Sequence, residues 1–106
     1  MFGDLMGNLE EKQKELKEKL REVPIKIQME NGALVIEGNA AKHVDNITID
    51  PQLIIDQGTE GLEDLLVVGI NNFMDAASKQ EAEMMKGFLS GILPSGLSGL
   101  GGLFSQ

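Results

Sequence analysis

The spacing of apolar residues changes from helical to strand-like at Pro24. Upstream of this proline, Leu9, Leu16 and Val23 recur every seven residues among Glu and Lys side chains. This spacing predicts a helix over residues 4–22 with one narrow apolar stripe. Because proline lacks a backbone N–H and disfavours helical geometry at the preceding residue, we expect the helix to end before Pro24.

Apolar and polar residues alternate directly after the proline. From Ile25 to Met29 every second residue is apolar, and a second strand-like run begins at Leu34, which predicts an antiparallel hairpin. Asn31-Gly32 lies between the two runs and tolerates the positive φ angles of a type I′ turn. This turn sets the register of the predicted strands, with three opposing pairs: Met29 and Leu34, Ile27 and Ile36, and Lys26 and Glu37.

A third strand and a second helix complete the pattern. A turn around Gly38-Asn39-Ala40 leads to the third predicted strand, Val44 to Ile49, which Pro51 ends. The second helix is predicted to begin near Thr59, where acidic residues lie close to the positive end of the helix dipole. The chain therefore predicts an α+β fold: a helix, a three-stranded antiparallel sheet and a long helix.

The second predicted helix has more apolar surface than one small sheet can cover. Its apolar positions extend over more than a third of its circumference, and Gly69 would allow close approach of another backbone. We therefore predict that this helix contains a self-association surface. The predicted dimer-interface residues are Leu62, Leu65, Leu66, Ile70, Phe73 and Met74.

The composition changes abruptly near residue 90. Residues 1–90 predict a single domain, whereas residues 91–106 contain five glycines, one proline and leucines at three-residue spacing. Gly and Pro at this density disfavour a stable helix. Two interpretations stay open for residues 91–106: a flexible tail, or a short hydrophobic segment that docks on the dimer or on another protein.

The net charge of −8 is confined to the larger part of the chain. Residues 1–26 contain six basic and six acidic residues, while residues 27–106 contain three basic and eleven acidic residues. The electrostatic field of this excess negative charge repels a polyanion such as DNA unless the few bases are gathered on one face.

Several classes of protein are disfavoured by the composition. The chain has no cysteine, so it has no disulfide, thiolate metal site or cysteine nucleophile. No apolar run approaches the ~18–20 residues of a membrane span, and the first residues do not resemble a signal peptide. We expect a soluble cytoplasmic protein that does not contact membranes.

No group of residues predicts catalysis or a cofactor. His43 is the single histidine and falls in a predicted turn, where a solvated surface role is the usual one. Glu60, Glu63 and Asp64 are better explained as acids at a helix start than as a metal site. No glycine-rich phosphate loop follows a strand. We therefore predict no enzyme, no catalytic residues, no metal, no cofactor and no small-molecule substrate.

The bases of the first predicted helix form two stripes. Lys14, Lys17 and Arg21 share one side, and Lys12 and Lys19 share another. One interpretation is that a dimer doubles each stripe and contacts DNA phosphates; the other is a solvent-facing helix whose lysines pair with the alternating acids. The predicted nucleic-acid-binding residues are Lys12, Lys14, Lys17, Lys19, Arg21, Lys79 and Lys86.

Short motifs occur in a specific order along the chain. Met1-Phe2-Gly3 opens it, Thr48-Ile49-Asp50-Pro51-Gln52-Leu53 spans the end of the third predicted strand, and Leu62-Glu63-Asp64-Leu65 precedes Asn71. In the order and spacing of these motifs, from Met1 to about Phe88, the chain resembles the YbaB/EbfC family of small bacterial nucleoid-associated proteins.

The resemblance implies an intertwined homodimer in which the helices pack between two sheets and project as arms. It also implies binding to double-stranded DNA with little sequence preference, a location at the nucleoid and no catalytic site. Three places depart from the family's basic pattern: Val35, the pair Asp45-Asn46, and the run from Asn72 to Ala76. DNA binding is therefore expected to depend on the bases of the first helix, Lys79 and Lys86.

Two functional hypotheses follow. The first is a homodimeric nucleoid-associated protein that contacts duplex DNA through phosphates. The second is a structural or adaptor dimer that has lost DNA affinity and binds protein partners through the second helix or through residues 91–106.

Overall fold

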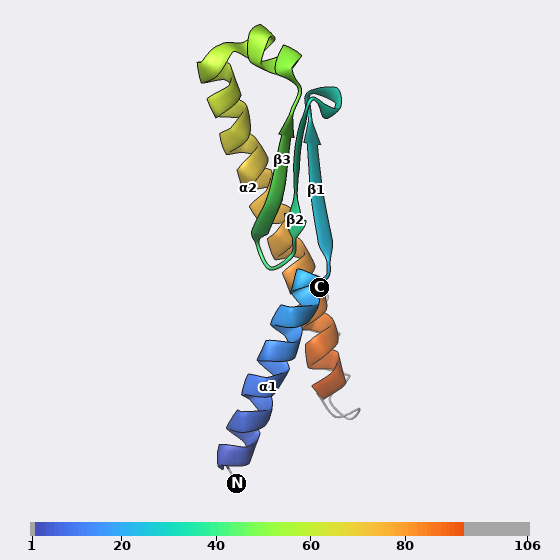
Figure 1. The fold of residues 1–106 in the computed structure, drawn as a ribbon. Helices are drawn as coiled ribbons and strands as arrows, with labels where there is room; N and C mark the ends of the chain where they lie inside the picture. Colours follow the sequence, from blue (N-terminus) through green and yellow to red (C-terminus); the bar gives the residue numbers. More distant parts are fainter. Residues whose placement is uncertain (1, 93–106) are drawn as a thin grey trace.

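The chain folds as a helix, a hairpin-connected sheet and a long helix (Figure 1). The computed structural model describes residues 2–92, with side chains for residues 9–90. The predicted α+β class and order of elements are confirmed. The elements are α1 (Phe2–Arg21), β1 (Pro24–Met29), β2 (Leu34–Asn39), β3 (His43–Ile49) and α2 (Pro51–Ile92).

A tight turn, η1 (Glu30–Gly32), connects β1 to β2. Asn31 has φ 57° and ψ 33°, Gly32 has φ 90°, and the N–H of Ala33 donates to the carbonyl oxygen of Glu30 at 3.1 Å. These are the features of a type I′ turn. The predicted register is confirmed, with Met29 opposite Leu34, Ile27 opposite Ile36, and Lys26 opposite Glu37.

Strand β3 pairs antiparallel with β2, so the sheet has the order β1-β2-β3. It begins at His43, one residue before the predicted strand, and His43 lies opposite Asn39 in the ladder. The prediction that His43 falls in a turn is therefore wrong. The turn consists of Ala40–Lys42, and it is short enough that His43 already pairs with β2.

Helix α2 begins at Pro51, so the prediction of a start near Thr59 is wrong. Asp50 caps the helix, because its Oδ1 accepts a hydrogen bond from the backbone N–H of Gln52 at 2.9 Å. Pro51 occupies the first helical position, where its missing N–H would have no helical partner in any case. The same proline that ends β3 therefore also starts α2.

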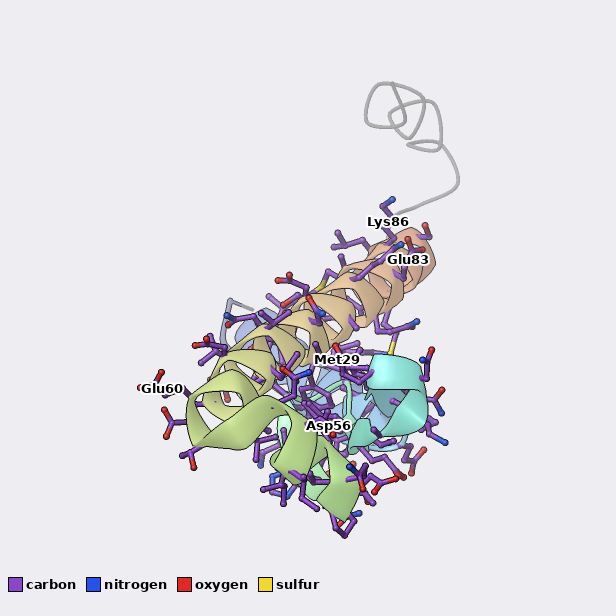
Figure 2. All side chains as sticks on the ribbon, turned by 90° about the horizontal axis from the view of Figure 1, so that it is seen from above. Met29, Asp56, Glu60, Glu83 and Lys86 are labelled. Carbon is purple, nitrogen blue, oxygen red and sulfur yellow. The ribbon has the colours of Figure 1, made fainter. Side chains whose placement is uncertain are left out.

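Gly58 divides α2 into a short and a long segment. Its φ of 71° and ψ of 178° lie in a region that only glycine adopts readily. Figure 2 shows the corner that results, with Asp56 on the short segment and Glu60 on the long one. The predicted start near Thr59 corresponds to the beginning of the long segment.

The core lies where α2 and the second half of α1 meet the inner face of the sheet. Phe73 and Ile36 have no exposed surface, whereas Leu9 in the first half of α1 is 46% exposed. The apolar stripe of α1 is therefore buried only toward its C-terminal end. The buried residues that contact one another are Leu16, Leu20, Ile25, Ile36, Ala40, Phe73 and Ala77.

Gly69 allows α2 to lie close to the sheet. A Cβ at this position would lie 2.7 Å from Ile36 Cδ1 and 3.0 Å from Met29 Sδ. Figure 2 shows Met29 beside α2. The close approach predicted at Gly69 therefore takes place within one chain, whereas the sequence pattern predicts it between two copies.

The molecule is elongated, with extents of 62 × 32 × 18 Å. In Figure 1, α1 and the C-terminal part of α2 project beyond the lower end of the sheet, away from the Gly58 corner. No helix within residues 2–92 has an apolar stretch long enough to cross a membrane. Of the predicted segment 91–106, only Gly91 and Ile92 are described, as the end of α2, so a domain boundary at residue 90 stays a prediction.

Candidate nucleic-acid interface

Charge is segregated along the long axis of the molecule. Between Lys42 and Lys79 the chain has no Lys or Arg but seven acidic residues. This stretch forms β3, the Gly58 corner and the first half of the long α2 segment, which reach the upper end in Figure 1. Seven of the nine bases lie on α1 and on the last part of α2, at the lower end, together with seven acidic residues, so this end has no excess of negative charge. A polyanion is therefore repelled from the upper end, and the lower end is the candidate interface.

One stripe of α1 faces the second helix. Lys12 and Lys19 line a hollow of about 360 Å³ together with Met84 and Phe88 of α2. Glu15 also lines this hollow, so its lining contains both signs of charge. These two lysines therefore border a partly apolar groove between the helices.

The other stripe of α1 faces away from that groove. Lys14 and Lys17 line a second hollow, and Lys17 and Arg21 line a third of about 390 Å³. The third hollow also includes Asn39 and His43 from the sheet. The two predicted stripes therefore have different surroundings, and Arg21 is the base of α1 that lies beside the β2–β3 turn.

The bases of α1 are exposed, and within residues 9–90 none of them forms an ion pair. The ion pair of these residues joins Lys42 Nζ to Glu81 Oε2 at 3.9 Å, and His43 Nε2 lies 3.4 Å from Asp45 Oδ1. The interpretation of α1 as a salt-bridged helix therefore has no ion pair to support it among the described side chains. The α1 bases are available to an anionic partner.

Lys79 and Lys86 lie on α2 and are both exposed. They are seven residues apart, so they share one side of the helix. Figure 2 shows Lys86 near the far end of α2, close to Glu83. Neither lysine lines any of the three hollows that the α1 bases border. A ligand that contacts both groups would have to extend across the lower end of the molecule.

The predicted dimer-interface residues have unequal exposure. Phe73 is fully buried in the chain's own core, so it offers no surface to a second copy in this conformation. The others, Leu62, Leu65, Leu66, Ile70 and Met74, keep part of their surface exposed. Sequence reasoning missed Val67 and Val68, which are 61% and 49% exposed. Both valines follow Leu65 and Leu66 directly in the predicted helix, and this continuous apolar run could have identified them.

Sequence reasoning also missed the β2–β3 turn as part of the basic surface. Lys42 is the last residue of this turn, and His43 follows it directly. A lysine and a histidine are therefore adjacent in the chain. The structure places His43 and Asn39 in the same hollow as Arg21. In the sequence, the adjacent Lys42 and His43 beside a predicted turn were the indication that this turn contributes to the surface.

The acidic residues of the described chain do not form a metal site. Within residues 9–90, no group of three His, Asp or Glu side chains is arranged to hold a metal ion. Glu60, Glu63 and Asp64 are instead partly or fully exposed residues near the start of the long α2 segment.

Comparison with known proteins identifies the family. The model of the YbaB/EbfC DNA-binding family matches residues 1–92. The chain belongs to the YbaB/EbfC DNA-binding family. A nucleoid-associated protein of Afipia carboxidovorans is 32% identical over 95 residues, which cover 90% of this chain and 90% of that protein. A nucleoid-associated protein of Dictyoglomus thermophilum is 28% identical over 93 residues, covering 87% and 89% of the two chains.

A solved structure shares the YbaB/EbfC fold of this chain. The crystal structure of an uncharacterized protein from Helicobacter pylori superposes with a TM-score of 0.71 at 18% sequence identity. The superposition covers 83% of this chain and 92% of the other. At this identity the similarity establishes the arrangement of helices and strands.

Proposed function

We propose that this chain is a nucleoid-associated protein that binds duplex DNA as a homodimer, through phosphate contacts and with little sequence preference. The family is described as DNA-binding, and relatives are named nucleoid-associated proteins. The observation that supports the proposal most directly is the exposed set of α1 bases, which lack ion pairs among residues 9–90. A location at the nucleoid follows from the same proposal.

The types of basic side chain on α1 favour contacts with DNA phosphates over recognition of nucleotide bases. Four of the five are lysines and one is an arginine. Lysine acts as a point charge, whereas specific reading of base edges relies mainly on bidentate Arg, Asn and Gln contacts. Binding through phosphates positions a protein on the duplex but transmits no direct sequence information. Weak sequence preference is therefore the expected behaviour.

A second copy of the chain is the proposed cover for the exposed apolar side of α2. Val67, Ile70 and Met74 recur at i, i+3 and i+7, so they lie on one side of the helix. Val67 is 61% exposed and Ile70 is 36% exposed. Burial of apolar surface is the main favourable contribution to most protein–protein association. A dimer would also double the number of α1 bases that one duplex can meet.

Fluorescence anisotropy tests the DNA-binding proposal. The purified protein is titrated into labelled random-sequence duplexes at several salt concentrations. Release of counterions predicts that log K falls linearly with log salt, by about 0.9 for each phosphate contact. Two unrelated duplex sequences should give similar affinities. A lack of binding at low salt would refute the proposal.

A matched pair of variants tests the place of contact. Lys14→Gln with Lys17→Gln removes two charges from α1 and should weaken binding and reduce the salt slope. Gln52→Glu with Gln57→Glu changes the net charge by the same amount near the Gly58 corner and should affect binding much less. Equal effects of the two pairs would contradict contact through α1.

The adaptor function is the second candidate, and the charge distribution favours it. Residues 27–106 contain three basic and eleven acidic residues, which gives this part a net charge of −8. Together with the exposed Val67 and Val68, this suits a surface that binds protein rather than DNA. The adaptor function predicts no duplex binding at low salt, so the anisotropy titration separates the two candidates.

A further inference from the structure

We propose that the hollow between the C-terminal end of α1 and the β2–β3 turn is a phosphate-binding pocket. The hollow has a volume of about 390 Å³ and is lined by Lys17, Arg21, Asn39, Ala41 and His43. This inference rests on the proposed function for one point, the duplex backbone as the source of the phosphate. It assigns a ligand-binding role to Asn39 and His43, which lie on the sheet and not on α1.

The end of α1 is fixed against the turn by backbone hydrogen bonds. The N–H of Ala40 donates to the carbonyl oxygens of Leu20 at 3.1 Å and Val23 at 3.0 Å. Leu20 and Ala40 are also buried in the core. The carbonyl oxygen of Leu20 also accepts from the N–H of Val23 at 3.2 Å, so the last turn of α1 and the residue before β1 are held together with the turn. Arg21, the next residue, is thereby held beside the turn.

The turn itself is constrained by two hydrogen bonds to Asn39. The backbone carbonyl of Asn39 accepts a hydrogen bond from the N–H of Lys42 at 3.1 Å, and the side-chain Oδ1 of Asn39 accepts one from the N–H of Ala41 at 3.0 Å. Because the amide oxygen is engaged, the NH₂ group of Asn39 remains as a donor, and within residues 9–90 it makes no hydrogen bond. Asn39 and His43 lie opposite each other in the ladder, so their side chains leave the same face of the sheet.

The chemistry of the lining matches an anion with several oxygens. Lys17 and Arg21 contribute positive charge, and Asn39 contributes amide N–H donors. The planar guanidinium of Arg21 can donate two hydrogen bonds to one phosphate group. No carboxylate lines this hollow, whereas Glu15 and Glu10 line the two other hollows beside α1.

Two acidic residues lie next to residues in or beside the proposed pocket. Asp45 Oδ1 lies 3.4 Å from His43 Nε2, and Glu81 Oε2 lies 3.9 Å from Lys42 Nζ. The side chains of both pairs are between 43% and 72% exposed, so solvent weakens their effect. Lys17 and Arg21 have no such partner within residues 9–90 and therefore provide the charge that attracts the ligand.

The lining favours the phosphate of a nucleic-acid backbone over that of a free nucleotide. Ala41 is the one aliphatic residue of the lining, and no Phe is present. A nucleotide base would therefore find little apolar surface or aromatic area on which to stack. A phosphodiester in a duplex needs no such surface, since its base stays stacked in the helix.

The test uses one pair of variants in the pocket and one matched pair at the Gly58 corner. Lys17→Gln with Arg21→Gln removes both charges of the pocket, and Gln52→Glu with Gln57→Glu changes the net charge by the same amount outside it. Each protein is titrated with inorganic phosphate while the backbone amides of Ala41 and Lys42 are followed by ¹H–¹⁵N NMR. Each is then titrated with a random-sequence duplex at fixed salt. The NMR spectra also show whether each variant remains folded.

The phosphate titration decides whether the pocket exists. Saturable shifts at Ala41 and Lys42 that disappear in the Lys17→Gln, Arg21→Gln variant and persist in the matched variant support it. His43→Gln, which leaves α1 unchanged, should weaken the same shifts. The absence of saturable shifts in the unmodified protein overturns the pocket, and so does their persistence in the Lys17→Gln, Arg21→Gln variant.

The duplex titration decides the source of the phosphate. Loss of two phosphate contacts lowers the association constant by more than about tenfold at 0.1 M salt, so the pocket variant should lose at least this much and the matched variant less. If both variants lose the same amount of duplex affinity, the phosphate does not come from the duplex backbone, and a small phosphate compound is the ligand instead. If the unmodified protein binds no duplex, the proposed function fails, while the phosphate titration still decides the pocket.

Discussion

The ring of Phe73 occupies the space beside Gly38. Its Cζ lies 2.7 Å from the position that a Cβ on Gly38 would take, and the carbonyl oxygen of His43 borders the same space. Phe73 has no exposed surface, and Gly38 is the β2 residue over which it packs. The missing side chain at Gly38 therefore lets α2 contact the sheet next to the β2–β3 turn.

We expect Gly38→Ala to lower the free energy of unfolding by about 1–3 kcal/mol or more, because the new methyl group overpacks the core. Urea unfolding at a fixed protein concentration measures this change. Gly87→Ala is the matched control, since a Cβ at Gly87 meets no atom within 4 Å. In a helix this control should raise the free energy of unfolding by roughly 0.5–1 kcal/mol. Similar effects of both substitutions would contradict the close packing at Gly38.

Asp50 is expected to stabilise the start of α2 through its side chain. Asp50→Ala removes the acceptor for the N–H of Gln52 and should lower the free energy of unfolding by about 0.5–2 kcal/mol. Asp50→Asn keeps an oxygen acceptor and should change the free energy much less. Thermal or urea unfolding of the two variants measures the difference. Equal destabilisation by Ala and Asn would show that the cap contributes nothing.

The apolar side of α2 provides a test of dimer formation. Val67→Asp places a charge at a residue that is 61% exposed in one chain, so the fold of the chain should tolerate it. In a dimer the same charge would be buried without a partner and should shift the equilibrium toward monomer. Sedimentation velocity over a range of concentrations measures the shift. Ala82→Asp, at another exposed position on α2, serves as the control and should leave the dimer intact.

The sequence predicts the sheet well because its information is local. Asn31-Gly32 determines the turn through backbone angles, and that turn alone determines which residues of β1 and β2 face each other. The start of α2 is harder to predict, since Asp50-Pro51 suits the end of a strand and the start of a helix equally well. Gly58 adds to the ambiguity, because a glycine inside a helical run also resembles a linker.

The candidate site depends on contacts that no local pattern encodes. The spacing of Lys17 and Arg21 predicts that they share a side of α1, but not that His43 lies beside them. That proximity arises from the hydrogen bonds of Ala40 to Leu20 and Val23. In the same way, an apolar pattern on α2 does not reveal which positions its own sheet covers. Phe73 is covered and Val67 is not.

The elongated shape of the chain limits how it can lie on a duplex. At about 3.4 Å per base pair, a 62 Å molecule placed lengthwise would span about 18 base pairs and press its acidic end against the phosphates. Contact through the opposite end alone, where bases and acids are equal in number, avoids that excess of negative charge and stands the molecule upright on a much shorter footprint. The Gly58 corner, with Asp56 and Glu60, would then point outward. DNA coated in this way would display a negative outer layer, which keeps neighbouring coated duplexes apart instead of condensing them.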